Sequence, residues 1–94
     1  MNEAKIVRTV IVSNAQGLHA RAADIFVKMA KQYECRIEIV KDSQRVDGKS
    51  IWDILMLAAE QGTQISLEAC GQDAETALNA LVELVNSGFA EHES

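Results

Sequence analysis

The chain has 94 residues, of which 48% are hydrophobic and 24% are charged. This composition predicts a single globular domain over residues 1–94 and excludes a disordered chain. The formal net charge of −5 argues against a nucleic-acid binder, because such a protein needs a basic face to neutralise phosphates.

The apolar runs and the two cysteines indicate where the protein is located and which kinds of site it lacks. No run is long enough to span a bilayer, and the N-terminal residues do not resemble a signal peptide, so we expect a cytoplasmic protein without membrane insertion. Cys35 and Cys70 fall inside strand patterns, and we interpret them as small buried hydrophobic side chains. A disulfide is not expected in a reducing compartment, and the spacing predicts neither a metal site nor a cofactor.

The first half of the chain predicts a strand, a helix and two more strands. Residues 6–12 are rich in β-branched side chains and predict a strand, which a loop over 13–17 follows. Alternation over 35–39 predicts the second strand, and a turn over 41–44 leads into a short third one around 45–46. The helix between them has an apolar face made of Ala23, Phe26, Val27, Ala30 and Tyr33.

A second helix is predicted from about Ile51. Ser50 with Asp53 three residues later is a partial capping box, which is typical of a helix start. Gln61-Gly62 is the predicted end of this helix, because glycine commonly follows a helix.

A fourth strand and a third helix complete the chain. Alternation over 64–69 predicts the strand, Asp73 is the expected N-cap of the helix, and Asn86-Ser87-Gly88 is its expected stop. The residues after Gly88, ending at Ser94, are interpreted as a tail. The order is strand, helix, strand, strand, helix, strand, helix. It predicts an α+β fold, with a four-stranded, mainly antiparallel sheet and three helices packed on one face.

The segment Gly17-Leu18-His19-Ala20-Arg21 can carry chemistry. It lies between a glycine-containing loop and a helix start, where unpaired N–H groups and the helix dipole favour an anion such as phosphate. A neutral ring nitrogen of His19 could attack a phosphoryl donor, and the planar fork of Arg21 could bind two of its oxygens. A histidine at this position is also often a simple cap, and an arginine is often a surface residue, so the residues alone leave both interpretations open.

Residues 11–23 resemble the active-site segment of the histidine-containing phosphocarrier protein family, HPr, of the bacterial phosphoenolpyruvate-dependent sugar phosphotransferase system. Lys49-Ser50-Ile51 resembles the regulatory serine segment of that family, and residues 73–81 resemble its last helix. The resemblance extends over nearly the whole chain. It implies the HPr-like open-faced sandwich, in agreement with the predicted element order.

The resemblance also implies roles for individual residues. His19 would accept a phosphoryl group on Nδ1 from enzyme I, with phosphoenolpyruvate as the original donor, and pass it to IIA domains for sugar uptake. Arg21 would support the phosphohistidine, together with the backbone N–H groups of Ala20 and Arg21. The protein would then be a carrier with a covalent phosphohistidine intermediate and not an enzyme.

Ser50 has two interpretations. The resemblance implies phosphorylation by an ATP-dependent HPr kinase/phosphorylase, as in some bacteria, whereas a serine at a helix start needs no function beyond capping. The family usually has proline after the arginine, and this chain has Ala22. This departure supports an alternative function as a regulatory HPr-like binding module, in nitrogen-related or carbon-catabolite signalling, with little role in sugar transport.

A docking surface is expected around the second helix. Its residues are apolar nearly all round, so some of them, Trp52 above all, should be exposed, although Trp52 could instead fill the core. The resemblance places this surface close to His19, with a basic rim that would steer acidic partners. The predicted docking residues are Ile51, Trp52, Leu55, Ile25, Met29, Lys28, Lys31 and Lys49.

Two further expectations concern assembly and catalysis. We expect a monomer, because a carrier must expose its site to successive partners. A stand-alone hydrolase with His19 as general base is a third hypothesis. It is disfavoured, because no serine, cysteine or paired carboxylate accompanies His19 in a recognisable constellation.

Overall fold

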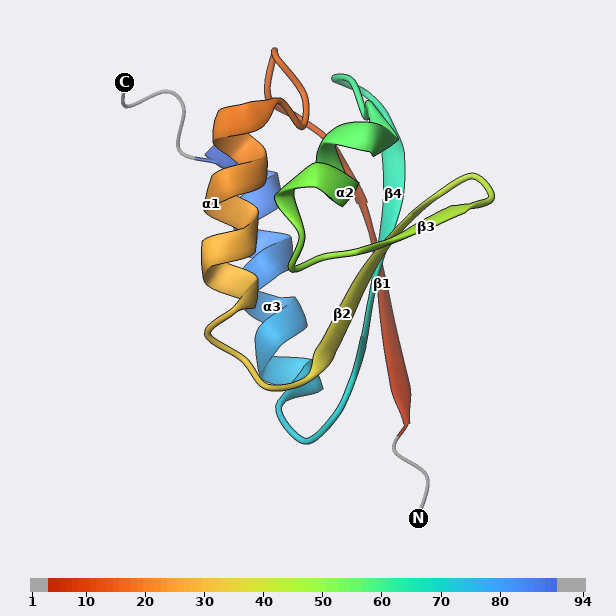
Figure 1. Cartoon of the computed structure of the whole chain (residues 1–94), viewed down its shortest axis with the longest axis vertical. Helices are drawn as coiled ribbons and strands as arrows, with labels where there is room; N and C mark the ends of the chain where they lie inside the picture. Colours follow the sequence, from red (N-terminus) through yellow and green to blue (C-terminus); the bar gives the residue numbers. More distant parts are fainter. Residues whose placement is uncertain (1–3, 90–94) are drawn as a thin grey trace.

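The computed structural model describes residues 4–89 and contains one sheet and three helices in the predicted order (Figure 1). The elements are β1 (Lys5–Ile11), α1 (Ala20–Ala30), β2 (Arg36–Lys41), β3 (Gln44–Asp47), α2 (Ile51–Leu57), β4 (Gln64–Cys70) and α3 (Ala74–Asn86).

The strands form a sheet in the order β1-β4-β2-β3, and every neighbouring pair is antiparallel. The strict alternation of the sequence decides which side chains face the helices. Ile37, Ile39, Ile65 and Leu67 are fully buried, whereas their neighbours along each strand are exposed or half-buried. The predicted α+β fold class is therefore confirmed.

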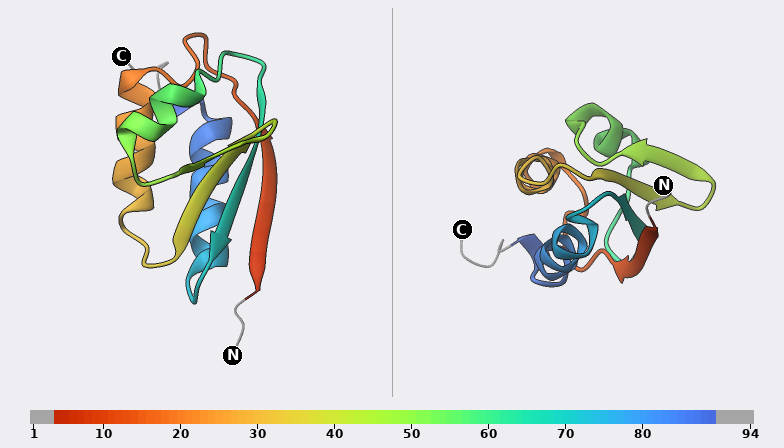
Figure 2. Two further views of the ribbon diagram at one scale, coloured as in Figure 1. Left: turned by 45° about the vertical axis from the view of Figure 1, so that its right-hand side comes forward. Right: turned by 90° about the horizontal axis from the view of Figure 1, so that it is seen from below.

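The helices lie on one side of the sheet, and the other face of the sheet is open (Figure 2). α3 lies over β1 and β4, while α2 lies beside β3 and the N-terminal half of α1 (Figures 1 and 2). The core between the layers includes Phe26, Ile54 and Leu81, one from each helix. This arrangement brings the start of α1 and the whole of α2 to the same end of the molecule.

α2 is shorter than the sequence predicts. It ends at Leu57, and Ala58 adopts the left-handed conformation with φ 53°, although the prediction placed the end at Gln61-Gly62. Two contacts stabilise the earlier end. The ammonium of Lys41 donates to the carbonyl of Leu57 at 2.8 Å, and the next residues leave the helix to pair with the loop before α1. Tertiary contacts thus override a local helix preference.

The C-terminal end of α3 confirms the predicted stop at Asn86-Ser87-Gly88, since Gly88 has a φ of 68°. The prediction of a tail directly after Gly88 is wrong for Phe89, which is only 2% exposed and belongs to the core. The rest of the predicted tail, residues 90–94, lies outside the described residues.

Asp73 occupies the N-cap position of α3, as predicted, but its side chain makes no capping hydrogen bond. Its two carboxylate oxygens accept hydrogen bonds from the backbone N–H groups of Glu34 and Cys35, each at 2.9 Å. Asp73 therefore ties the α1–β2 connection to the β4–α3 connection. Cys35 is buried as predicted, whereas Cys70 is only half-buried, and the two cysteines are not joined by a disulfide.

Candidate functional site

The loop that precedes α1 is held by the segment that follows α2. The N–H of Val12 donates to the carbonyl of Thr63 at 2.9 Å, and the N–H of Gly62 donates to the carbonyl of Val12 at 2.8 Å. At the other end of the loop, the N–H of Leu18 donates to the carbonyl of Ala59 at 2.9 Å. The loop is thus fixed at both ends by backbone hydrogen bonds from one neighbouring segment.

Gly17 allows this close approach. Its φ is +69°, a conformation that side-chain-bearing residues rarely adopt, and a Cβ atom at this position would lie 2.5 Å from the carbonyl oxygen of Ala59. It would also lie 2.9 Å from Cα of Glu60. The glycine of the sequence motif is therefore required by the backbone of a second segment as well as by its own turn.

Asn14 closes the turn from inside, a role that the sequence analysis missed. Its Nδ2 donates to the carbonyl of Gly17 at 2.7 Å, while the N–H of Gly17 donates to the carbonyl of Asn14 at 3.1 Å. A signal for this role was present, because asparagine side chains commonly bond to the backbone of the turn that they begin.

His19 is the N-cap of α1. Its backbone is extended (φ −79°, ψ −177°), and its carbonyl accepts the first helical hydrogen bond, from the N–H of Ala23 at 2.8 Å. The ring nitrogen Nδ1 accepts a hydrogen bond from the N–H of Arg21 at 3.1 Å. An imidazole that accepts at Nδ1 carries its proton on Nε2 when neutral, so Nδ1 bears the lone pair.

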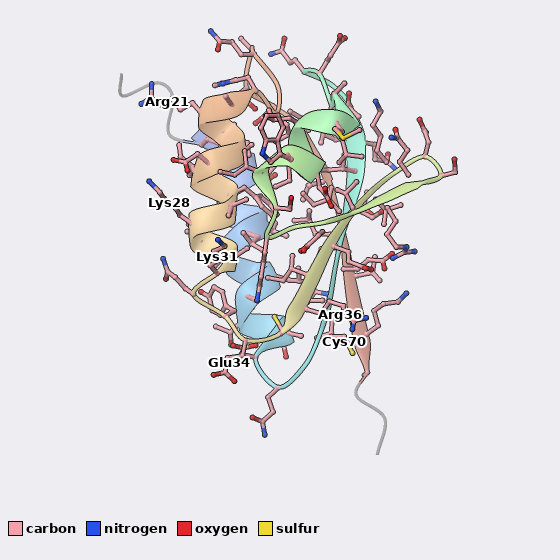
Figure 3. All side chains as sticks on the ribbon, in the orientation of Figure 1. Arg21, Lys28, Lys31, Glu34, Arg36 and Cys70 are labelled. Carbon is pink, nitrogen blue, oxygen red and sulfur yellow. The ribbon has the colours of Figure 1, made fainter. Side chains whose placement is uncertain are left out.

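The start of α1 has the electrostatics of an anion site. The N–H groups of the first helical residues lack partners inside a helix, and the helix dipole is positive at this end. The chain places the half-buried ring of His19 here, together with the exposed side chain of Arg21. Figure 3 shows Arg21 at this end of α1. Ala22, which departs from the usual proline, is fully buried and serves the core.

Ser50 is confirmed as the N-cap of α2. Its Oγ accepts a hydrogen bond from the N–H of Asp53 at 3.2 Å. The capping box is not completed, because the carboxylate of Asp53 accepts from the N–H of Asp47 instead, at 3.3 Å. Ser50 is half-buried.

The outer face of α2 is apolar and exposed, as the sequence predicts. Trp52 is 78% exposed, so it does not fill the core, while Ile51 and Leu55 are half-buried and pack against the core. Met56 is 73% exposed and was missed. It lies four residues after Trp52, so both side chains lie on one helix face, and this spacing could have revealed it.

The predicted docking residues of α1 have mixed surroundings. Ile25 and Met29 are half-buried beside the core. Lys28 forms an ion pair with Asp24 at 3.2 Å and remains exposed. Lys31 is exposed at the end of the helix, and Figure 3 shows Arg21, Lys28 and Lys31 in turn along α1.

Lys49 differs from these two lysines. Its Nζ donates to the backbone carbonyl of Tyr33 at 2.6 Å, so this ammonium links the start of α2 to the end of α1. It is half-buried, and we treat it as a structural contact that can still contribute to the local positive potential.

Within residues 4–89, no group of three or more histidine, cysteine or acidic side chains could hold a metal ion. In the same part of the chain, no helix is long and apolar enough to cross a membrane.

Comparison with known proteins identifies the family. The family model described as "PTS HPr component phosphorylation site" matches residues 6–87. The phosphocarrier protein HPr of Pseudomonas aeruginosa is 46% identical over 85 residues, which cover 89% of this chain and 94% of that protein. The phosphocarrier protein NPr of Shewanella violacea is 38% identical over 87 residues, or 93% of this chain and 96% of that one.

A solved structure gives the same result. The crystal structure of HPr-C-His from Thermoanaerobacter tengcongensis superposes with a TM-score of 0.89 at 41% identity, and the match covers 92% of this chain and 97% of that chain. The chain belongs to the HPr family, and it is a phosphocarrier protein of the phosphotransferase system.

Proposed function

We propose that His19 is the phosphoryl carrier, which accepts the group on Nδ1 from enzyme I and passes it to IIA domains for sugar uptake. The observation that carries this proposal is the position of Nδ1, which lies 3.1 Å from the N–H of Arg21 at the open start of α1. A nucleophilic lone pair and the N–H groups that favour an anion meet at this point.

Transfer to His19 is a single displacement. The lone pair of Nδ1 attacks phosphorus, the new N–P bond forms, and the bond between phosphorus and the donor breaks, with its electron pair leaving on the donor. The proton on Nε2 stays in place, so the phosphorylated ring is an imidazolium until Nε2 loses its proton. Transfer onward reverses these events with an acceptor nucleophile on the IIA domain.

The phosphoryl oxygens then replace Nδ1 as acceptors. The N–H of Arg21 loses its nitrogen partner when Nδ1 forms the N–P bond, and it can donate to a phosphoryl oxygen instead. The N–H of Ala20 lies one residue closer to the helix start and can donate in the same way. The exposed guanidinium of Arg21 adds a cation with a planar fork. These groups stabilise charge, while the partner proteins provide the other half of each site.

The test is phosphorylation by phosphoenolpyruvate and enzyme I from the same organism, followed by phosphorus NMR. A phosphohistidine signal that is labile to acid is expected in the parent protein. His19→Asn is the matched control, because asparagine is a good N-cap and keeps α1 capped without the nucleophile. The absence of a signal in the parent protein, or its persistence in His19→Asn, would reject the proposal. Arg21→Ala should slow the reaction with little change in melting temperature, because the side chain is exposed.

We propose that partners dock on the apolar face of α2 beside α1. Trp52 and Met56 are the most exposed large apolar side chains of that helix, and contiguous exposed apolar residues usually mark an interface. Trp52→Ala should raise the KM of enzyme I for this protein while the fold remains intact. An unchanged KM would remove Trp52 from the docking surface.

Regulation at Ser50 by an HPr kinase is part of the proposal. A phosphate at the N-cap of α2 is compatible with the helix dipole, so it should leave the helix intact and act by repelling acidic partners. Ser50→Asp keeps a capping acceptor and adds charge, whereas Ser50→Ala removes the cap and adds none. Slower transfer in Ser50→Asp alone would support regulation, and equal rates in both variants would argue against it.

A second candidate function is a regulatory phosphocarrier. The observation that favours it is the similarity to the NPr of Shewanella violacea, together with Ala22 in place of the usual proline. Phosphorylation assays with enzyme I from the sugar system and from the nitrogen-related branch would separate the two functions, because the physiological donor should react faster. We further infer a monomeric, cytoplasmic protein, and sedimentation at assay concentrations tests the monomer.

A further inference from the structure

Asn14 is a polar residue placed inside the core. It is 6% exposed, and among residues 4–89 it is the one buried polar side chain. Its Oδ1 is buried and has no hydrogen-bond partner within that part of the chain. A buried acceptor without a donor destabilises a fold, so an apolar residue would be the more stable choice unless the amide has a task.

The amide nitrogen of Asn14, in contrast to its oxygen, has a hydrogen-bond partner that indicates its role. Nδ2 donates to the carbonyl of Gly17 at 2.7 Å, shorter than the backbone hydrogen bond of 3.1 Å that closes the same turn. Gly17 is two residues before His19, and the intervening Leu18 is buried and bonded to Ala59. The amide therefore fixes the direction of the peptide that leads to the cap of α1.

We propose that Asn14 is a positioning residue for phosphoryl transfer, which orients the 14–18 turn so that Nδ1 of His19 faces the open start of α1. This inference rests on the proposed function of His19. Asn14 itself touches neither the phosphoryl group nor the partner, because it is buried beneath the turn. Its contribution is the fixed geometry of the nucleophile.

The physical reason is the sensitivity of transfer to geometry. Attack at phosphorus needs the nitrogen lone pair in line with the bond that breaks, and a small misplacement of a reacting group can reduce a rate by orders of magnitude. Without the amide, the carbonyl of Gly17 loses a buried donor, and the turn can reorient around Leu18. His19 would then spend less time with Nδ1 at the helix start.

The test measures enzyme I kinetics with Asn14→Ala as the substrate. We expect kcat to fall by about tenfold or more, with KM changed by less than about twofold, because the docking surface is unaltered. Asn14→Ser is the second variant, since its hydroxyl is one bond shorter than the amide and cannot span the turn. The kinetics of Asn14→Ser replace those of Asn14→Ala if the alanine variant does not fold.

Ser13→Ala is the matched control. Ser13 is the preceding residue, and its Oγ also donates to a backbone carbonyl, that of Val85 at 3.0 Å, but this contact points away from the turn to the end of α3. Its removal should leave kcat unchanged. An equal fall of kcat in Ser13→Ala and Asn14→Ala would overturn a specific role for Asn14, as would a parent-like kcat in both Asn14 variants.

NMR of the folded variants provides a second measurement, the chemical shifts around His19, which a loss of stability alone would not change. In the parent, the amide of Arg21 donates to Nδ1 of His19, and both nuclei should report this bond. Asn14→Ala should shift the Arg21 amide proton and the Nδ1 nitrogen toward values of a weakened bond, whereas Ser13→Ala should not. Unchanged shifts in Asn14→Ala would overturn the inference. Failure of the parent to form phosphohistidine would reject the function of His19 itself, and the shifts would then test the geometric claim separately.

Discussion

Replacing Gly17 with alanine tests the close contact that frames the site. The methyl group would sit 2.5 Å from the carbonyl oxygen of Ala59 and 2.9 Å from Cα of Glu60, and both are backbone atoms that cannot rotate away. The left-handed φ of +69° adds about 1–2 kcal/mol for any residue with a Cβ. Overpacking against a fixed wall adds about 1–3 kcal/mol. We expect Gly17→Ala to lower the free energy of unfolding by about 2–5 kcal/mol.

Gly62→Ala is the matched control for this substitution. Gly62 also has a left-handed φ, of +90°, but a Cβ atom there would meet nothing within 4 Å. Its cost should be the conformational part alone, about 1–2 kcal/mol. The difference in unfolding free energy between the two variants isolates the cost of the steric clash. The clash should also slow phosphorylation, in Gly17→Ala only, because its relief must displace Leu18 and the His19 cap that follows.

The assay is urea unfolding followed by far-UV circular dichroism, because the exposed Trp52 is a poor fluorescence probe of the core. The two variants should keep the m-value of the parent, so that the shift in midpoint reports stability. For a domain of this size, each kcal/mol corresponds to about 4–8 °C in melting temperature. If Gly17→Ala is destabilised no more than Gly62→Ala, the contact with Ala59 does not constrain the loop and the reasoning fails.

Three other predictions concern stability and thiol chemistry. Ala58→Gly should raise stability by about 1 kcal/mol in thermal unfolding, because the left-handed cap of α2 has a φ of 53°; an unchanged or lower melting temperature would contradict this. Hydrogen bonds from the backbone N–H groups of the α1–β2 connection lower the pKa of Asp73 below its ordinary value of 3.8. The ionised carboxylate therefore stabilises the folded state above pH 3.8, and this stabilisation is lost as the pH falls through the lowered pKa. Urea titrations across acidic pH should show the stability gap between parent and Asp73→Asn closing there, and a constant gap would argue against the carboxylate. Burial, with the hydrogen bond to Asp73, raises the pKa of Cys35 to about 11, so iodoacetamide at pH 8 should alkylate Cys70 first, and mass spectrometry of the native protein would refute this if Cys35 reacted first.

The sequence predicted those parts of the structure in which local pattern and tertiary role agree. Alternation along β2 and β4 predicted which side chains are buried, and Ser50 predicted the start of α2 through its own hydroxyl. The segment from Gly17 to Arg21 was recognised because it lies between a glycine-containing loop and a helix start. The structure gives Gly17 a left-handed φ and places His19 at the N-cap of α1.

The errors arose where a distant segment decides the local structure. Nothing in Met56-Leu57-Ala58-Ala59 stops a helix, since all four residues are compatible with one. α2 ends there because Ala59 must accept the N–H of Leu18 across the molecule. Asp73 likewise occupies a cap position, but its carboxylate is engaged by two N–H groups almost forty residues earlier in the chain.

The long-range contacts hold the turn before His19, whereas the exposed face of α2 takes no part in them. The side chains of Trp52 and Met56 on α2 are mostly exposed, so substitutions there should leave the core intact. The turn before His19 is held by a backbone hydrogen bond from Leu18 to Ala59 and by the side chain of Asn14. If His19 is the phosphoryl carrier that we propose, these contacts fix the position of its ring. In the reaction with enzyme I, substitutions on the exposed face of α2 should therefore act mainly on KM, and substitutions beneath the turn before His19 mainly on kcat.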